Sequence, residues 1–184
     1  MEAKRSMSDP VTSFLALKSY CEAENFAGWD PYDGLNSRVF QALPLKKWDL
    51  ARLAWIQGFK RSPVNFRKML AVPKGHNPMG IGLFLSGYCN LYHLASNGNT
   101  TYGTEDEILT TIDKLAQLLV SLKSIGYSGA CWGYNFDWQS RRIFLFPSGT
   151  PNVVVTAFCA IPLYEAYEIT GEDAFLNMAL DSAR

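Results

Sequence analysis

The sequence carries no net charge, because 17 lysines and arginines balance 17 aspartates and glutamates over 184 residues. Proteins that bind nucleic acid or anionic membranes present a basic patch or stripe. The one basic cluster, Lys60-Arg61 with Arg67-Lys68, is too small to provide such a surface. The composition therefore argues against nucleic acid as a partner.

Metal-ligating residues are few and are not grouped. The histidines are His76 and His93, and the four cysteines have no CxxC spacing: Cys21, Cys89, Cys131 and Cys159. Zinc sites need several such ligands at short, regular intervals, and nucleotide cofactors leave glycine-rich signatures that are absent here. We therefore predict no metal and no cofactor. We expect free, buried thiols, which suit a reducing compartment, and a buried, hydrogen-bonded His93.

Long apolar runs are also missing. No segment approaches the 18 uninterrupted apolar residues of a membrane helix, and residues 1–6 lead into no signal peptide. We therefore expect a cytoplasmic protein without a membrane span. With 48% hydrophobic and 18% charged residues, the chain has the composition of one globular domain over residues 1–184.

Helical periodicity dominates the rest of the chain. Ser8-Asp9-Pro10 and Thr104–Glu107 are helix openings with a capping side chain. Apolar residues at helical spacing predict helices over residues 10–26, 38–43, 48–59, 64–70, 79–96, 105–122, 153–170 and from 174 onward. The single β signal is residues 143–146, which we expect to pair with residues 132–136. The predicted fold class is therefore all-α, with at most one short β-hairpin.

A weak internal repeat suggests how the helices are arranged. Leu91–Gly98 and Tyr164–Gly171 are both helix ends that stop at glycine before an acidic start and another apolar helix. This pattern predicts helical hairpins with short turns at one end and the long, aromatic loops at the other. Such hairpins build an α/α toroid. Trp48 and Trp55, seven residues apart in one helix, are predicted to lie in its core.

Candidate catalytic residues lie in two loops, Gly28–Ser37 and Gly129–Asn152. Glycoside hydrolysis needs a carboxylic acid and a carboxylate on either side of the bond, and Asp137 facing Asp30 or Asp33 would supply them. The alternative is that Asp30 and Asp33 cap turns and that Asp137 pairs with a neighbouring arginine.

The same loops supply candidate binding residues. Aromatic rings suit the apolar faces of sugars, and amides suit their hydroxyl groups. The candidates are Trp29, Tyr32, Trp132, Trp138, Asn135, Gln139, Arg141, Arg142 and Asn152. Tyr134 with Arg141 or Arg142 would also suit a uronate lyase or epimerase, in which a tyrosine moves a proton and an arginine holds the substrate's charge. The alternative is that the rings fill the core.

Several segments, Gly28–Ser37, Trp132–Gln139 and Thr150–Phe158 with Ala166–Gly171 behind them, resemble a group of microbial proteins encoded near polysaccharide-handling genes. Their helices are similar to the six-hairpin glycosidase and terpenoid-cyclase toroids. The resemblance covers the chain from about residue 10 to its end. It implies a toroid and a carbohydrate or isoprenoid ligand, and it assigns no catalytic residue.

One departure from this pattern concerns size. A complete toroid has about twelve helices, whereas this sequence predicts six or seven besides the short segment 38–43 and stops within a helical pattern. We expect either a further C-terminal half or two copies that cover each other's open face, since a large apolar edge is rare on single domains. Three functions follow as hypotheses: a carbohydrate-active enzyme, a glycan- or lipid-linked-sugar-binding scaffold without activity, or a purely structural helical domain.

Overall fold

The computed structural model describes residues 9–141 and 144–183, and these residues form an all-α fold with one short β-hairpin. The α-helices are α1 (Pro10–Ala23), α2 (Arg38–Ala42), α3 (Asp49–Arg61), α4 (Pro78–Ser96), α5 (Glu105–Ser121), α6 (Val153–Thr170) and α7 (Asp173–Asp181). Two short 3-10 helices, η1 (Asp33–Asn36) and η2 (Pro44–Lys47), flank α2. The predicted fold class is confirmed.

The β-hairpin pairs β1 (Trp138–Gln139) with β2 (Leu145–Phe146) in antiparallel register. The sequence located β2 correctly, but the partner predicted for it, residues 132–136, is wrong. That segment is held instead by loop contacts: Asn152 N donates to Trp132 O at 2.9 Å, and Gly149 N donates to Tyr134 O at 2.8 Å.

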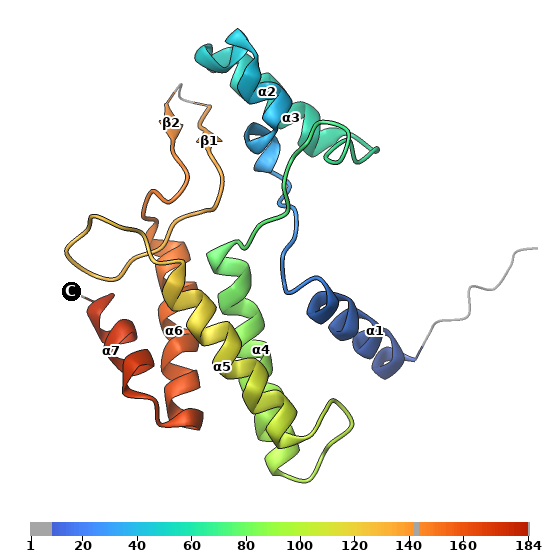
Figure 1. Ribbon diagram of the computed structural model, residues 1–184, viewed down its shortest axis with the longest axis vertical. Helices are drawn as coiled ribbons and strands as arrows, with labels where there is room; N and C mark the ends of the chain where they lie inside the picture. Colours follow the sequence, from blue (N-terminus) through green and yellow to red (C-terminus); the bar gives the residue numbers. More distant parts are fainter. Residues whose placement is uncertain (1–8, 142–143, 184) are drawn as a thin grey trace, which may run out of the picture.

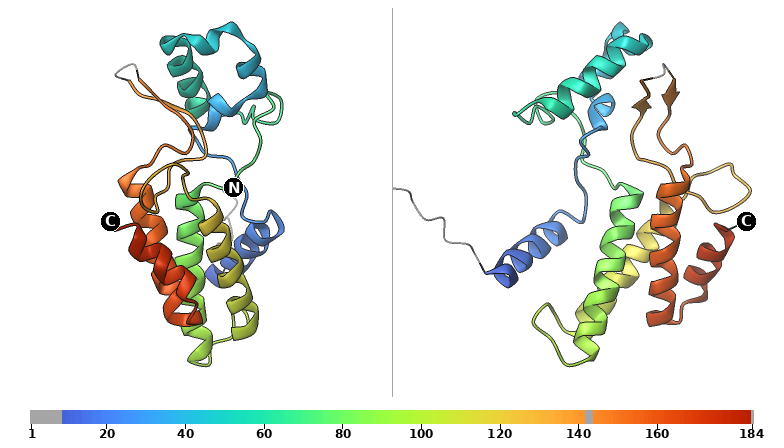
Figure 2. Two further views of the ribbon diagram at one scale, coloured as in Figure 1. Left: turned by 60° about the vertical axis from the view of Figure 1, so that its left-hand side comes forward. Right: turned by 180° about the vertical axis from the view of Figure 1, so that it is seen from behind.

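The main core lies in a bundle of α4, α5, α6 and α7 (Figures 1 and 2). Helix α5 shows why these residues form helices: its capping box joins Thr104 and Glu107, and its buried face repeats at helical spacing. That face consists of Ile108, Ile112, Leu115, Ala116 and Leu119. In Figure 1 the short connections 97–104 and 171–172 lie at one end of the bundle, and the long connection 122–152 lies at the other.

Helices α4 and α6 approach each other closely at Gly82. A Cβ atom added at this position would lie 1.9 Å from Phe158 O, which no real contact tolerates. Glycine at position 82 therefore permits this close helix packing. Gly87 has no such role, since an added Cβ there would meet nothing within 4 Å.

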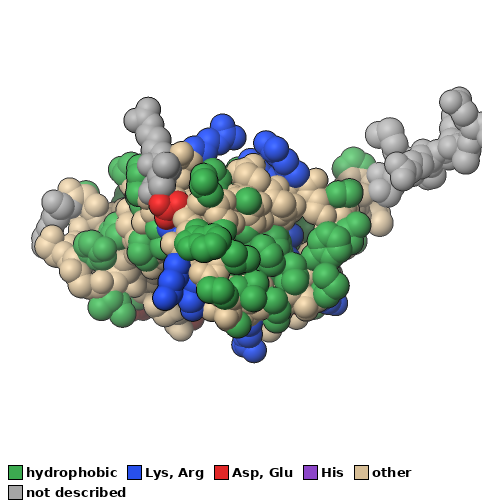
Figure 3. Space-filling view, turned by 90° about the horizontal axis from the view of Figure 1, so that it is seen from above, with side chains coloured by type: hydrophobic (Ala, Val, Ile, Leu, Met, Phe, Trp, Pro, Cys, Tyr) green, Lys and Arg blue, Asp and Glu red, His purple; other side chains and the backbone are tan. Residues whose placement is uncertain are grey.

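A smaller lobe of α2, α3 and the two 3-10 helices lies beyond the loop end of the bundle (Figure 1). Its own hydrophobic cluster contains Leu35, Phe40 and Ile56, with Trp55 stacked on Phe40 at 4.7 Å between ring centroids. The prediction that Trp48 belongs to the core is wrong: 65% of it is exposed, because this small cluster buries only Ile56 from α3. Figure 3 views this end from above, where hydrophobic side chains gather on the surface.

The predicted helix over residues 64–70 is also wrong, because this segment forms turns. Side chains compete there for the backbone groups that a helix would need. Ser62 Oγ accepts from Val64 N at 3.1 Å, and Asn65 Oδ1 accepts from Arg67 N at 3.1 Å. The prediction that His93 is buried is wrong as well, since it lies on the exposed side of α4.

Helix α6 is apolar on nearly all sides. Val155, Cys159, Leu163 and Ala166 are fully buried, whereas Ile161 on the opposite side is 60% exposed. By length and composition α6 is the one helix of residues 9–141 and 144–183 that could cross a membrane, although the core helices of soluble proteins meet the same criterion. Within the fold, α6 packs against α4, α5 and α7.

Helix α1 lies beside the bundle and buries none of its residues (Figure 2). A polar contact attaches it: Tyr88 Oη donates to Glu22 Oε1 at 2.7 Å, and Lys18 Nζ lies 2.8 Å from the same oxygen. Burial alone would raise the pKa of Glu22, but the hydrogen bonds from Lys18 and Tyr88 outweigh it and hold this pKa below its ordinary value of 4.5.

The Gly82 contact predicts a large effect of one methyl group. Gly82→Ala should lower the free energy of unfolding by about 1–3 kcal/mol, because the helices must move apart. Gly87→Ala is the matched control and should be neutral or slightly stabilising, since alanine favours the helix. Urea denaturation of both variants measures this, and equal stabilities would contradict the close contact.

The Glu22 contact predicts that α1 loosens in acid. A lowered carboxyl pKa stabilises the docked helix above about pH 4.5, and this contribution disappears as the pH falls through the folded-state pKa. Protection factors of the α1 amides, which correct for the intrinsic pH dependence of hydrogen exchange, should therefore fall below about pH 4.5 in the wild type. In Glu22→Gln these protection factors should be lower at neutral pH and should lose this acid response. The same pH profile in both proteins would contradict the role of Glu22.

Candidate functional site

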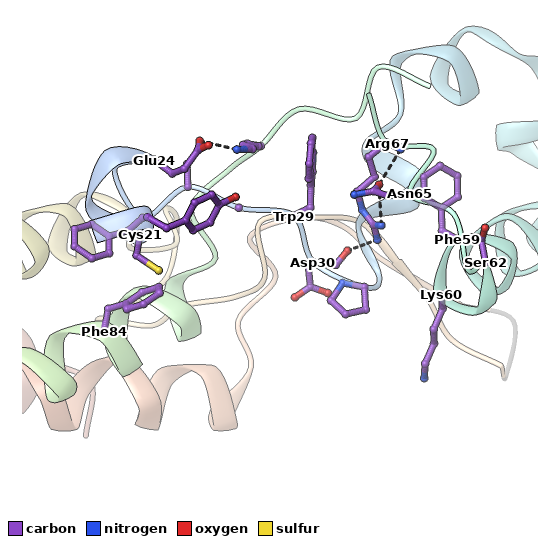
Figure 4. Close-up of a pocket in the computed structure, with 16 residues that line it drawn as sticks. Cys21, Glu24, Trp29, Asp30, Phe59, Lys60, Ser62, Asn65, Arg67 and Phe84 are labelled. Carbon is purple, nitrogen blue, oxygen red and sulfur yellow. Dashed lines mark hydrogen bonds and ion pairs between the residues drawn. The ribbon is translucent and has the colours of Figure 1, made fainter. Parts of the chain in front are cut away.

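Three cavities meet at the loop that precedes η1, and Asp30 lines all of them. The aromatic cavity, of about 540 Å³, lies against Tyr134, Phe136 and Trp138. The central cavity, of about 230 Å³, lies against Asn36, Asn77 and Asn135. The tryptophan cavity, of about 540 Å³, surrounds Trp29 between the end of α1 and the end of α3 (Figure 4). Volumes of this size are typical of small-molecule sites.

The loop holding Asp30 is folded by its own aspartates. Asp30 Oδ1 accepts from Tyr32 N at 2.9 Å, and Asp33 Oδ2 accepts from Asp30 N at 3.0 Å. The first bond is an Asx turn, in which a short side chain replaces a backbone acceptor, and the second joins the Asp33 side chain back to the start of the same turn. The turn-capping alternative stated for Asp30 and Asp33 is therefore the arrangement found.

Two further contacts fix the loop to the segment before α4. Gly28 and Gly75 form an isolated antiparallel bridge, with N–O distances of 3.0 and 2.9 Å. The indole N–H of Trp29 donates to Val72 O at 3.0 Å. The ring of Trp29 therefore has a fixed position, and it lines both the central and the tryptophan cavities.

Asp33 is held in an ion pair. Its Oδ1 lies 2.8 Å from Nε of Arg67, and Arg67 Nη2 donates to Asp30 O at 2.8 Å. Burial raises the pKa of Asp33, and the neighbouring Arg67 only partly offsets this effect. Asp33 is 4% exposed and lines the central cavity, and its catalytic role stays a prediction.

The aromatic cavity collects most of the open residues predicted for the site. Tyr134 and Phe136 are stacked at 5.1 Å with an interplanar angle of 16°. Trp138 is 38% exposed and stacks on Phe146 at 5.4 Å. Asn152 caps α6 by accepting from Val154 N at 2.9 Å, and it also lines the cavity. Asp30 and Tyr32, from the loop Gly28–Ser37, also line this cavity.

The loop Gly129–Asn152 can bring Tyr134 to this cavity because Gly133 has no side chain. A Cβ atom at that position would lie 2.0 Å from Thr150 O, so two segments of the loop touch there. This close approach places Tyr134 beside the start of α6. The loop shape thus depends on a glycine within the predicted Trp132–Gln139 segment.

Other predicted residues lie elsewhere. Trp132 is fully buried and donates its indole N–H to Leu119 O at 2.8 Å, so the prediction that it stacks on a sugar is wrong. Gln139 is 2% exposed and is used structurally, because its Oε1 accepts from Arg52 Nε at 2.7 Å. Trp132 is therefore packed in the core of the helix bundle, and Gln139 is held by its hydrogen bond to Arg52 of α3.

Asp137 is not brought into a shared cavity with Asp30. It lines none of the three cavities, and its Oδ1 accepts from Ser148 N at 2.8 Å. Arg141 is exposed and, within the described part of the chain, forms no ion pair with Asp137. Arg142 lies outside the described residues.

Asn135 has an unusual environment at the wall of the central cavity. Its Oδ1 atom is buried and has no hydrogen-bond partner among the described residues. A buried acceptor without a partner costs about 1–3 kcal/mol. Such a group is a candidate for contact with a ligand or with an ordered water.

Sequence reasoning missed several residues that line these cavities. Asn77 lies just before the predicted helix over residues 79–96, yet its amide donates to Asp30 Oδ2 at 3.1 Å while its oxygen caps α4 at Met79 N. The Asn77-Pro78 pair, a helix-capping signal, could have placed it at a helix start. Lys60, Arg67 and Lys74 gave no local signal, because only the tertiary fold brings them to Trp29.

The aromatic cavity can bind a ring but has only one carboxylate among its lining residues, that of Asp30. Hydrolysis of a glycosidic bond requires two carboxyl groups on opposite sides of it. Among residues 9–141 and 144–183, no three His, Cys, Asp or Glu side chains are grouped to hold a metal ion. Comparisons with family models, curated proteins and solved structures found no match.

The ion pair of Asp33 and Arg67 predicts a stability effect with a pH signature. Arg67→Met should lower the free energy of unfolding by about 3 kcal/mol at neutral pH, because it leaves a buried carboxylate without its partner. A raised pKa of Asp33 means that its ionised form opposes folding, so the loss should shrink as the pH falls toward 3.8. Denaturation at several pH values measures both effects. Exposed Lys68→Met is the control, and an equal effect of both changes would contradict the assignment.

Proposed function

We propose that the protein binds a carbohydrate in the aromatic cavity and does so without catalysing a reaction on it. The observation that carries this proposal is the lining of the cavity, which combines Tyr134, Phe136 and Trp138 with Asp30 and Asn77. Small-molecule sites combine such apolar walls with a few fixed polar groups. A sugar ring matches this combination, since it has apolar faces and a rim of hydroxyl groups.

The state of the carboxylates favours binding over hydrolysis. Asp33 is paired with Arg67, and Asp137 is hydrogen-bonded to a backbone N–H away from the cavity. Asp30 accepts from Tyr32 N and from the Asn77 amide, which fixes its orientation as a hydrogen-bond acceptor for a hydroxyl group. No second carboxylate among the lining residues is available to act as acid or nucleophile.

The resemblance to toroid proteins associated with polysaccharides supports the same ligand class. Helical hairpins whose long loops share one end are compatible with part of an α/α toroid (Figure 1). Four free cysteines, of which Cys89 and Cys159 are buried with pKa values raised by burial to about 12, suit the reducing cytoplasm that we propose as its location.

A tryptophan replacement tests the proposal. Trp138→Ala should weaken binding to the preferred glycan of a printed array by at least about tenfold, because the ring that a sugar face would contact is removed. Trp48→Ala is the matched control: its ring is 65% exposed but lines none of the cavities, so its affinity should equal that of the wild type. Titration calorimetry of the three proteins measures this.

Two outcomes would count against carbohydrate binding at this cavity. Failure of the wild type to bind any glycan on the array would eliminate the ligand class. Equal losses in Trp138→Ala and Trp48→Ala would place the binding surface elsewhere.

A further inference from the structure

We infer that the ligand is an acidic oligosaccharide that extends from the aromatic cavity past Asp30 into the tryptophan cavity, where its negative charge lies near Lys60. This inference rests on the proposed function and deepens it. It assigns a second subsite, and it names a chain of several rings as the ligand.

The first observation is that the cavities share walls. The aromatic and tryptophan cavities share Asp30 and Pro31, and the central cavity shares Asp30 with both. Each outer cavity has about 540 Å³, whereas the central one has about 230 Å³. Two wide spaces on either side of a narrow one fit a ligand with rings at both ends better than a single ring.

The second observation is the tryptophan in the far cavity. Figure 4 shows Trp29 standing between Glu24, Cys21 and Phe84 on one side and Phe59 and Arg67 on the other. Its ring is half-buried, and its N–H is already bonded to Val72 O. Lys74 Nζ lies over the ring at 5.2 Å from its centroid, and the part of the ring that remains open is apolar, the kind of surface that a sugar ring contacts.

The third observation is the charge around Trp29. Lys74 is neutralised by Glu24 at 2.5 Å, and Arg67 is neutralised by Asp33 at 2.8 Å. Lys60 differs from both, since its Nζ donates to the neutral phenol of Tyr32 at 2.5 Å and has no carboxylate partner in the described part of the chain. Of the three cations that line the tryptophan cavity, Lys60 is thus the one without a carboxylate partner, and an anionic group placed toward Lys60 and away from the carboxylate of Asp30 would supply one.

The fourth observation concerns Asn135, which lines the central cavity. Asn135 Oδ1, at the central cavity, is buried without a hydrogen-bond donor among the described residues. A hydroxyl group of the bridging part of the ligand would supply that donor. Its lack of a partner is explained if the side chain serves binding at the expense of stability.

The test uses oligogalacturonates of one to four units, with their methyl esters as uncharged chains of the same length. The wild type should bind the charged trimer on the order of tenfold more tightly than the monomer, because only the longer chain reaches both outer cavities. Lys60→Gln should weaken binding of the charged trimer by about three- to fivefold and leave its methyl ester unaffected. Binding of the charged trimer to Lys60→Gln should also no longer depend on the salt concentration. Exposed Lys68→Gln is the control and should behave as the wild type.

A second variant, at Asn135, tests whether binding needs a long ligand without changing any charge. Asn135→Ala should weaken binding of the trimer but not of the monomer, while the melting temperature stays equal or rises. A lower melting temperature with unchanged affinity would mean that Asn135 is structural, and it would overturn its part in the path.

The outcomes separate this inference from the proposed function. Equal affinities for monomer and trimer, no preference for the charged chains, or an unchanged Lys60→Gln would overturn the extended acidic ligand. Binding of neutral glycans that still depends on Trp138 would leave the proposed function intact in that case. Absence of binding to every glycan would overturn both.

Discussion

The hydrogen-bonded loop around Asp30 and Asp33 is the feature on which the rest of the site depends. Asp33 Oδ2 accepts from the backbone N–H of Asp30, and Asp30 Oδ1 accepts from that of Tyr32. Arg67 joins both aspartates through a carboxylate oxygen of Asp33 and the carbonyl oxygen of Asp30. The bonds among residues 30 to 33 are local in sequence, whereas the bond between Asp33 and Arg67 joins residues 34 positions apart. It positions Asp30 where the bundle, the small lobe and the β-hairpin loop come together, and all three cavities open from that point.

The network also explains why carboxylates that resemble a catalytic pair do not form one. An ionised carboxylate pays a desolvation cost on burial, and Asp33 is stable in this place because Arg67 and a backbone N–H satisfy its oxygens. Once so engaged, it cannot exchange protons with a substrate without breaking the loop. Asp30 remains at the cavity surface with a fixed orientation, which suits hydrogen bonding to a ligand more than proton transfer.

Sequence reasoning captured the parts of the fold that local patterns control. The capping box at Thr104 and the glycine stop at Gly171 lie at helix boundaries, as their chemistry requires, and the apolar stripe of α5 is its buried face. Sequence reasoning gave wrong predictions where several local interactions compete for the same residues. Residues 64–70 have helical spacing, but Ser62 and Asn65 bond to nearby backbone groups and form turns. Trp48 has a helical partner in Trp55, yet the small lobe buries only one of them well.

The site was partly predictable for the same reason. Asp30, Tyr32, Tyr134, Trp138 and Asn152 were found because they lie in two aromatic loops, and the fold does bring those loops to one cavity. Trp132 and Gln139 lie in the same segment, but nothing in the sequence distinguishes residues that face the core from those that face the cavity in an irregular loop. Lys60 and Asn77 were missed because their importance arises only from contacts with residues 28 and 47 positions away in sequence.

The central claim is that the cavities around Asp30 form one ligand site. A crystal structure of the protein with a bound glycan tests it most directly. We predict electron density for a sugar ring between Trp138 and Asp30, with the carboxylate of Asp30 within hydrogen-bond distance of a hydroxyl group. A glycan bound on another surface, such as the exposed side of α6, with the three cavities empty, would contradict the account.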